Sequence, residues 1–120
     1  MRFFGLLLWV SVLAAQGPDD QILKDAIAAH QAGNIDAAIG GYERFLKVYP
    51  DTLIALSNLG AAYASTDRLP EAVEAYRRAL VLAPNDPDIH ENLAQALAQL
   101  GRVAEAQGEH LAAERLRSAP

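Results

Sequence analysis

The 120-residue sequence contains no cysteine. This absence excludes disulfide frameworks, cysteine-ligated zinc, thiol nucleophiles, c-type haem attachment and the lipid-anchored cysteine of a bacterial lipoprotein. Basic residues are also scarce, with 10 Lys and Arg against 15 Asp and Glu, and the net charge is −5. Because nucleic-acid binding requires a basic surface, this charge balance argues against DNA and RNA as partners.

Glycine and proline are few, 8 and 6 residues, while hydrophobic residues make up 52% of the chain. That composition excludes a disordered or low-complexity chain. Alanine contributes 24 residues, and alanine has the highest helix propensity and lets helices approach closely. We therefore expect a single all-α domain.

The one long hydrophobic run lies at the N-terminus. Arg2 precedes residues 3–15, which are almost all apolar, and polar residues follow. The run is shorter than the ~20 residues that span a bilayer as a helix, and the pattern is typical of a secretory signal peptide. We predict a signal peptide over residues 1–15 that is cleaved near Ala14 or Ala15. The mature protein is then secreted or periplasmic, without membrane contact; an uncleaved anchoring segment is the alternative.

The rest of the chain repeats with a period of 34 residues, which divides it into segments 19–52, 53–86 and 87–120 without a gap. Internal repeats of this length are the signature of stacked helical modules. Residues one period apart keep their size and polarity, as in Ala26, Gly60 and Ala94; Ala38, Ala72 and Ala106; Ile35, Leu69 and Val103; and Val48, Leu82 and Leu116.

Each segment has the pattern of two amphipathic helices separated by a turn, so six helices are expected. The turns are predicted at Gly33, at Asp67-Arg68 and at Gly101, and Asp86 is placed to cap the helix that follows it. The small residues of each pair, such as Gly60 and Ala72, are expected where its two helices come closest. Gly40, Gly41 and Gly108 fall inside second helices, where they either permit close contacts or are tolerated weak points.

The middle segment resembles a tetratricopeptide repeat, through Leu56-x-x-Leu59-Gly60-x-x-Tyr63 followed by Ala72, Tyr76, Ala79 and Pro84. The resemblance extends over residues 19–120 and implies a right-handed α-solenoid of three repeats. The outer segments depart from the pattern. The first has Asp25 and Ala29 where leucine and tyrosine are usual, and the third has His90 and His110 in aromatic positions and Ser118 in place of proline.

The third segment differs from the others along its second helix. An apolar stripe on the second helices of the first two segments is expected to pack against the next repeat. The equivalent stripe of the third is polar, which predicts a last helix that faces water, ends the stack and keeps the protein monomeric. Drift in a degenerate repeat, with adhesive ends, is the alternative. The stripes are Ile39, Tyr42, Leu46 and Tyr49; Val73, Tyr76, Leu80 and Ala83; and Gln107, His110, Glu114 and Arg117.

No residue pattern indicates catalysis. A nucleophile beside a base, a metal cluster and a glycine-rich phosphate loop are all missing from the sequence. The histidines His30, His90 and His110 lie in different predicted helices, so we expect no metal site and no cofactor. A metal shared by His90 and His110 is the minor alternative.

The resemblance implies that the first helices of the repeats line a concave groove that binds an extended or helical peptide. Asn58 and Asn92, one period apart, fall where the family often has asparagine, and an amide can both donate to and accept from a peptide backbone. Their alternative role is local hydrogen bonding or contact with water. The candidate groove residues are Lys24, Ile27, His30, Ser57, Asn58, Ala61, Glu91, Asn92, Gln95 and Gln99.

The predicted groove does not suit an acidic ligand. The basic clamp with which chaperone-binding family members hold a terminal carboxylate is missing, since Asp88 and Asn92 stand in its region. Lys24 alone opposes Asp20, Asp88 and Glu91 on this face, so a neutral or mildly basic protein segment is the expected ligand. The alternative function is a structural or assembly subunit of an envelope complex that uses its convex face or its ends.

Overall fold

A computed structural model describes residues 18–120; the predicted signal peptide and its cleavage sites lie outside these residues. Over that range the chain forms helices and no strands, which confirms the predicted all-α fold. No described helix has both the length and the apolar character needed to cross a membrane. The six helices are α2 (Pro18–Gln31), α3 (Ile35–Val48), α4 (Leu53–Ser65), α5 (Leu69–Leu82), α6 (Pro87–Gln99) and α7 (Val103–Ser118).

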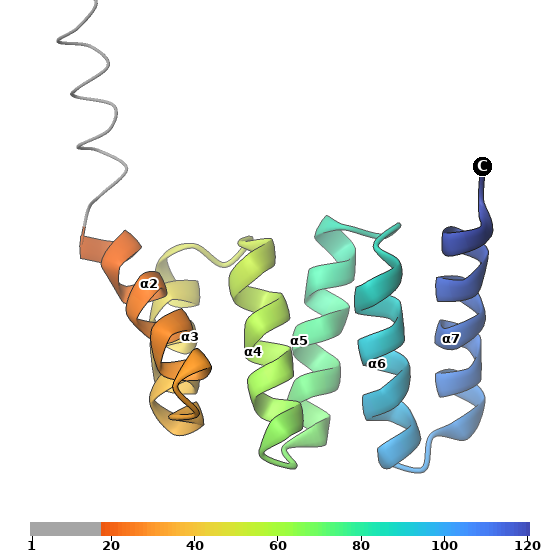
Figure 1. The fold of residues 1–120 in the computed structure, drawn as a ribbon, viewed down its shortest axis with the longest axis horizontal. Coiled ribbons are helices and arrows are strands. Elements are labelled where there is room, and N and C mark those ends of the chain that lie inside the picture. The colour runs from red at the N-terminus through yellow and green to blue at the C-terminus, as the bar shows by residue number, and fades with distance from the viewer. Residues whose placement is uncertain (1–17) are drawn as a thin grey trace, which may run out of the picture.

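The helices form hairpins that stack in chain order (Figure 1). Helix α2 packs on α3, α4 on α5 and α6 on α7, while α3 contacts α4 and α5 contacts α6. Helices α2, α4 and α6 lie toward the viewer in Figure 1, and α4 touches both of the others. Each predicted 34-residue segment holds one hairpin, although α2 begins one residue before its segment; the segment boundaries stay a prediction.

The same turn closes all of the described hairpins. Gly33, Asp67 and Gly101 adopt positive φ angles of 82°, 61° and 80°. The amide of the next residue bonds back to a carbonyl five residues earlier in each case, at 2.8 to 2.9 Å. This left-handed residue with its long backward hydrogen bond is the Schellman end of a helix. The predicted turn positions are therefore confirmed, and Asp67 occupies a conformation that glycine adopts at lower cost.

Helix starts also follow the sequence. The Asp86 carboxylate accepts hydrogen bonds from the amides of Asp88, at 2.9 Å, and Ile89, at 3.4 Å, as a capping residue does. Pro70 and Pro87 occupy the first turns of α5 and α6, where a missing amide proton costs nothing.

Large apolar side chains fill the space between hairpins, and Tyr42, Leu56, Leu93 and Leu97 are fully buried. Gly60, on α4, lies against the ring of Tyr76, on α5, because a Cβ on Gly60 would fall 2.6 Å from that ring. The glycine thus leaves room for the tyrosine ring. It also belongs to the α4–α5 pair, in which the sequence predicts a small residue at this position.

The helical glycines divide into two kinds. A Cβ on Gly41 would lie 2.7 Å from the Cβ of Ala26, so Gly41 permits the close approach of α2 and α3. Gly40 and Gly108 face open space. For Gly41 the interpretation as a tolerated weak point is therefore wrong, because the helices could not approach as closely with a larger residue there.

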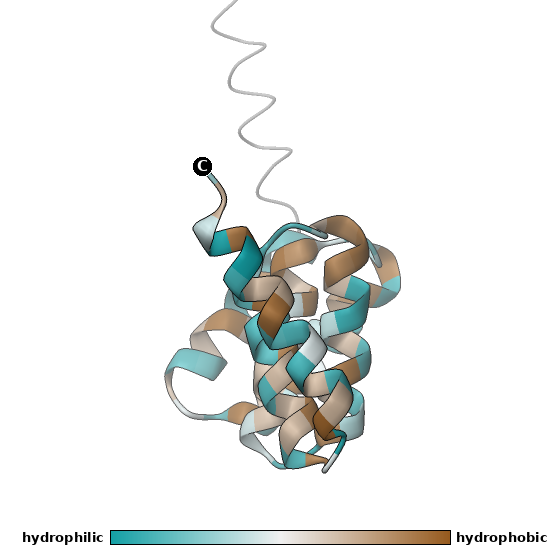
Figure 2. Cartoon of the chain, turned by 90° about the vertical axis from the view of Figure 1, so that its right-hand side faces the viewer, coloured by the Kyte–Doolittle hydropathy of each residue, from teal (hydrophilic) through white to brown (hydrophobic). Residues whose placement is uncertain are grey.

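Helix α7 differs from α3 and α5 in how little of it is covered. Its buried residues are Ala106 and Ala113, and the face turned to the viewer in Figure 2 carries many hydrophilic residues. The four stripe residues of the third segment, Gln107, His110, Glu114 and Arg117, are all exposed. The equivalent residues of α5 are buried or half-buried.

Candidate peptide-binding groove

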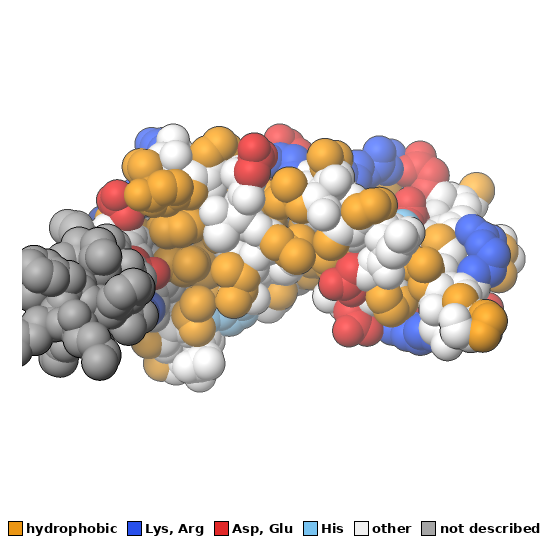
Figure 3. Space-filling view, turned by 90° about the horizontal axis from the view of Figure 1, so that it is seen from above, with side chains coloured by type: hydrophobic (Ala, Val, Ile, Leu, Met, Phe, Trp, Pro, Cys, Tyr) orange, Lys and Arg blue, Asp and Glu red, His pale blue; other side chains and the backbone are white. Residues whose placement is uncertain are grey.

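The ten candidate residues lie on α2, α4 and α6. One long side of the molecule is hollowed, as the view from above shows (Figure 3), and these three helices occupy that side. Ile27 is half-buried and packs on the core, whereas Lys24 is exposed and pairs with Asp20 at 3.3 Å. Ser57 and Ala61 are half-buried on α4, the helix that lies between α2 and α6.

Two of the candidates meet at a buried tyrosine. Tyr42 is inaccessible to solvent, and its hydroxyl lies 3.1 Å from Nδ1 of His30. Burial raises the pKa of Tyr42, and a side-chain hydrogen bond from Asn58 opposes the increase. Asn58 is half-buried, and its contact with a ligand stays a prediction. Sequence reasoning missed Tyr42 at this site because its periodicity marked it only as a core residue.

The C-terminal end of the groove contains side chains from α7 that the sequence did not place there. Nδ1 of His110 lies 2.8 Å from a carboxylate oxygen of Glu91. The Arg117 guanidinium lies 3.0 Å from Asp88 and 3.9 Å from Glu91, and His110 also lies 3.2 Å from Glu114. The hydrogen bond to Glu91 is the main cause that raises the pKa of His110. The Arg117 cation offsets one carboxylate of α6, while α7 also adds the carboxylate of Glu114 to this end of the groove.

A row of amides on α6 is open to solvent. Asn92, Gln95 and Gln99 are exposed, and none of them makes a side-chain hydrogen bond to another residue of the range 18–120. An amide without a protein partner has both its donor and its acceptor available. The row is therefore the part of the candidate site that is free to bind a ligand backbone.

His90 belongs to a different contact. Its Nδ1 lies 2.6 Å from Glu109 of α7, and its Nε2 lies 2.7 Å from the carbonyl oxygen of Pro84. Burial lowers the pKa of His90, but the bonds to Glu109 and Pro84 outweigh it, and the net shift is upward. No group of three or more His, Asp or Glu side chains in the described part of the chain is arranged to hold a metal ion. Each histidine of this hairpin instead joins α6 to α7 through a glutamate.

Stacked helical hairpins with a hollowed side made by the first helix of each define a helical-repeat protein, an α-solenoid. Two models of the tetratricopeptide repeat match the chain, over residues 23–87 and 75–108. The chain belongs to the tetratricopeptide repeat family.

Curated relatives of several kinds share the repeat. The photosystem I assembly protein Ycf3 of Synechococcus sp. (strain CC9605) is 33% identical over 95 residues, which cover 77% of this chain and 55% of that protein. The peroxisomal targeting signal receptor of Candida glabrata is 38% identical over 110 residues, 92% of this chain and 18% of the receptor. Human protein O-mannosyl-transferase TMTC1 is 41% identical over 66 residues, 55% of this chain and 7% of that protein. The chain spans about half or less of the length of these relatives.

Solved structures show the same fold. MamA of the strain MSR-1 has a TM-score of 0.80 and 26% identity, covering 94% of this chain and 66% of that one. The first tetratricopeptide domain of Spaghetti (RPAP3), bound to an HSP90 peptide, has a TM-score of 0.78 and 17% identity, covering 85% of this chain and 81% of that one. At that identity the likeness concerns the fold alone.

Proposed function

We propose that the protein is a non-catalytic, exported module that binds an extended or helical segment of a protein partner in its concave groove. The observation that carries the proposal is the row of exposed amides on α6, beside the half-buried Asn58, on the hollowed side of the molecule. Amides of this kind bind a peptide backbone without requiring a particular sequence. Support comes from the names of similar proteins, which include a targeting-signal receptor and a tetratricopeptide domain bound to a peptide.

The ligand is proposed to be a neutral or mildly basic segment with apolar side chains. Ile27 and Ile54 offer apolar contacts near the N-terminal half of the groove, and Ile54 is 52% exposed. At the other end Arg117 pairs with Asp88, while Glu91 and Glu114 leave an excess of carboxylates, so an acidic segment is disfavoured there.

Export is part of this proposal and rests on the sequence of residues 1–15. Edman degradation of the protein recovered from its native host tests it. A mature N-terminus at Ala15 or Gln16 supports cleavage, whereas a protein that retains Met1 contradicts it.

Photo-crosslinking tests the groove. A photoreactive amino acid replaces Gln95, in the groove, or Gln107, on the outer stripe of α7; both residues are exposed. The proposal predicts that the native envelope or secreted fraction yields a discrete crosslinked partner from position 95 and none from position 107. The reverse result supports instead an assembly subunit that uses its end.

A substitution then separates binding from folding. Asn92→Ala combined with Gln95→Ala removes two exposed amides that bond to no other described residue, so the thermal midpoint is expected to stay the same. Because this variant lacks Gln95, the photoreactive amino acid is placed at Gln99. Loss of the crosslinked partner with an unchanged melt supports binding in the groove, and unchanged crosslinking contradicts it. Asn58→Ala is a less selective test because Asn58 is half-buried and influences the pKa of buried Tyr42.

A further inference from the structure

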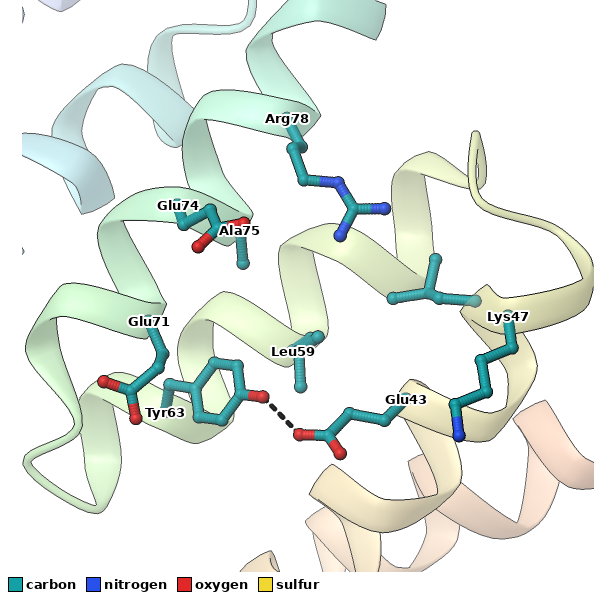
Figure 4. A pocket seen from close by; sticks show the side chains of 9 residues that line it. Glu43, Lys47, Leu59, Tyr63, Glu71, Glu74, Ala75 and Arg78 are labelled. Atoms are coloured by element: carbon teal, nitrogen blue, oxygen red, sulfur yellow. Dashed lines mark hydrogen bonds between the residues drawn. The ribbon is translucent and has the colours of Figure 1, made fainter.

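Two clefts lie between the second helices of successive hairpins, on the face opposite the groove. Cleft 1, of about 310 Å³, is formed by α3 and α5 over α4 (Figure 4). Cleft 2, of about 570 Å³, is formed by α5 and α7 over α6. Their linings are equivalent through the 34-residue period, with Leu46 matching Leu80, Lys47 matching Val81, Leu59 matching Leu93 and Glu71 matching Glu105.

The charges of cleft 2 are paired within the protein. Glu105 bonds to Arg77 at 3.0 Å and to Arg102 at 2.7 Å, and Glu109 bonds to His90 at 2.6 Å. A cleft whose charges already have partners has little electrostatic reason to bind a charged ligand.

In cleft 1 only one charge, that of Glu71, has an ionic partner within the described residues. Glu43 accepts a hydrogen bond from the Tyr63 hydroxyl (Figure 4), and Glu71 bonds to Arg68 at 2.8 Å. Burial, together with the bond to Glu43, raises the pKa of Tyr63 to about 12, so its hydroxyl stays a donor. Of the three acidic side chains in this cleft, Glu71 therefore has a cationic partner, whereas Glu43 and Glu74 have none among residues 18–120.

The two cations of cleft 1 lie on facing walls. Lys47 belongs to α3, which forms one wall of the cleft, and Arg78 belongs to α5, which forms the other wall. Leu59 lies between them at the floor (Figure 4). Arg78 donates to the carbonyl oxygen of Pro50 at 3.3 Å, and neither cation has an acidic partner in the described chain. The position equivalent to Lys47 is Val81, and the position equivalent to Arg78 is Ala112, so this pair of cations is particular to cleft 1.

We propose that cleft 1 is a second binding site, which holds an acidic side chain of a protein segment between Lys47 and Arg78. An adjacent apolar side chain of the same segment packs on Leu46, Leu59 and Ala75, which line the cleft. Its volume is at the lower end of the ~300–1,000 Å³ of small-ligand pockets, so it accommodates side chains and not a whole helix.

Glu74 restricts which side chains the bound segment can carry. It lies one helical turn before Arg78 on the same wall, and its free carboxylate repels a second acid in the ligand. A basic residue beside the acidic one meets Glu74 favourably. The occupant is thus a segment with neighbouring acidic, apolar and basic side chains, in contrast to the neutral or mildly basic ligand proposed for the groove.

Two short peptides test the site by methyl NMR of the leucines. The probe is acetyl-Lys-Leu-Leu-Glu-Gly-amide, and its control has glutamine in place of glutamate. We expect saturable shifts of Leu46 and Leu59 with the first peptide and much weaker binding of the second. Shifts confined to other residues, or equal binding of the two peptides, would overturn the proposal.

Variants of the two equivalent clefts complete the test. Lys47→Gln with Arg78→Gln is expected to weaken binding about fivefold or more, the effect of two exposed ion pairs. Arg77→Gln with Val81→Gln, in cleft 2, is the matched control and leaves binding unchanged.

Val81→Lys with Ala112→Arg transfers the cations to cleft 2 and is expected to produce new shifts of Leu80 and Leu93. Unchanged affinity in the first variant, with an unchanged melt, contradicts the assignment, and crosslinking from Gln95 is unaffected in either case.

Discussion

The middle hairpin, α4–α5, and the last hairpin, α6–α7, share a turn and a period, yet the faces of their second helices differ. On α5 the stripe residues Val73 and Tyr76 are 5% and 3% exposed, and the ring of Tyr76 lies against Gly60 of α4. One period later, the side chains of His110 and Glu114 are 49% and 60% exposed. The two second helices therefore differ in how much of the stripe is covered, and we propose that the polar stripe of α7 ends the stack.

The largest effect is expected from the stripe itself. Tyr76→Ala removes a buried ring that packs on Gly60 of α4 and should lower the free energy of unfolding by about 3–5 kcal/mol. His110→Ala, at the equivalent position of the last hairpin, should leave the urea midpoint nearly unchanged. Equal losses in the two variants, measured by urea denaturation, would show that the end of the stack is as covered as its middle.

Two glycines give a second contrast. Gly60→Ala places a Cβ 2.6 Å from the ring of Tyr76 and should destabilise the protein by about 1–3 kcal/mol. Gly108→Ala places its Cβ in open space within α7 and should stabilise it by about 0.5–1 kcal/mol. Thermal melts followed by circular dichroism report both changes, and shifts of the same sign contradict the packing described for α4 and α5.

The turns of the two hairpins provide a smaller contrast. Asp67 holds a φ of 61°, where Gly101 holds 80° in the last hairpin. Asp67→Gly should stabilise the protein by about 0.5–1 kcal/mol, since glycine adopts this conformation without steric cost. Gly101→Asp should have the opposite effect of similar size. A loss of stability in Asp67→Gly, measured by urea denaturation, would contradict the assigned turn.

The smallest effect is a pH dependence confined to the last hairpin. The pKa values of His90 and His110 are raised above 6.5 in the folded protein. A raised folded-state pKa adds stability that is fully present below the unfolded pKa, near 6.5, and is lost as the pH rises through the folded value. The thermal midpoint should therefore fall modestly from just below pH 6.5 to pH 8.

A double variant, His90→Gln with His110→Gln, isolates this contribution. The difference in thermal midpoint between the original protein and the variant should shrink over the same pH range. A difference that stays constant, or that grows with pH, contradicts the histidine–glutamate contacts between α6 and α7.

Much of the fold follows from local sequence signals. The 34-residue period, the turn residues Gly33 and Gly101 and the cap at Asp86 each depend on a few neighbouring residues, and the helices begin and end where these signals predict. The contact of Gly41 with Ala26 was not predicted, because it depends on how closely two helices approach. Periodicity gives the face of a helix but not its distance from the next one.

The candidate site was predictable only in part. The sequence assigned its residues to the first helices, and the structure places those helices on the hollowed side. It did not predict that His110 bonds to Glu91 or that His30 bonds to Tyr42, because such pairs depend on the register between antiparallel helices. That these residues contact a ligand stays a prediction.

Sedimentation velocity tests most directly the central claim that the polar last helix ends the stack. The protein should remain monomeric over a wide concentration range. Gln107→Val, His110→Tyr and Glu114→Leu together restore the apolar stripe of the inner hairpins, and this variant should form larger species as its concentration rises. An original protein that associates, or a folded variant that stays monomeric at every concentration, would contradict the claim.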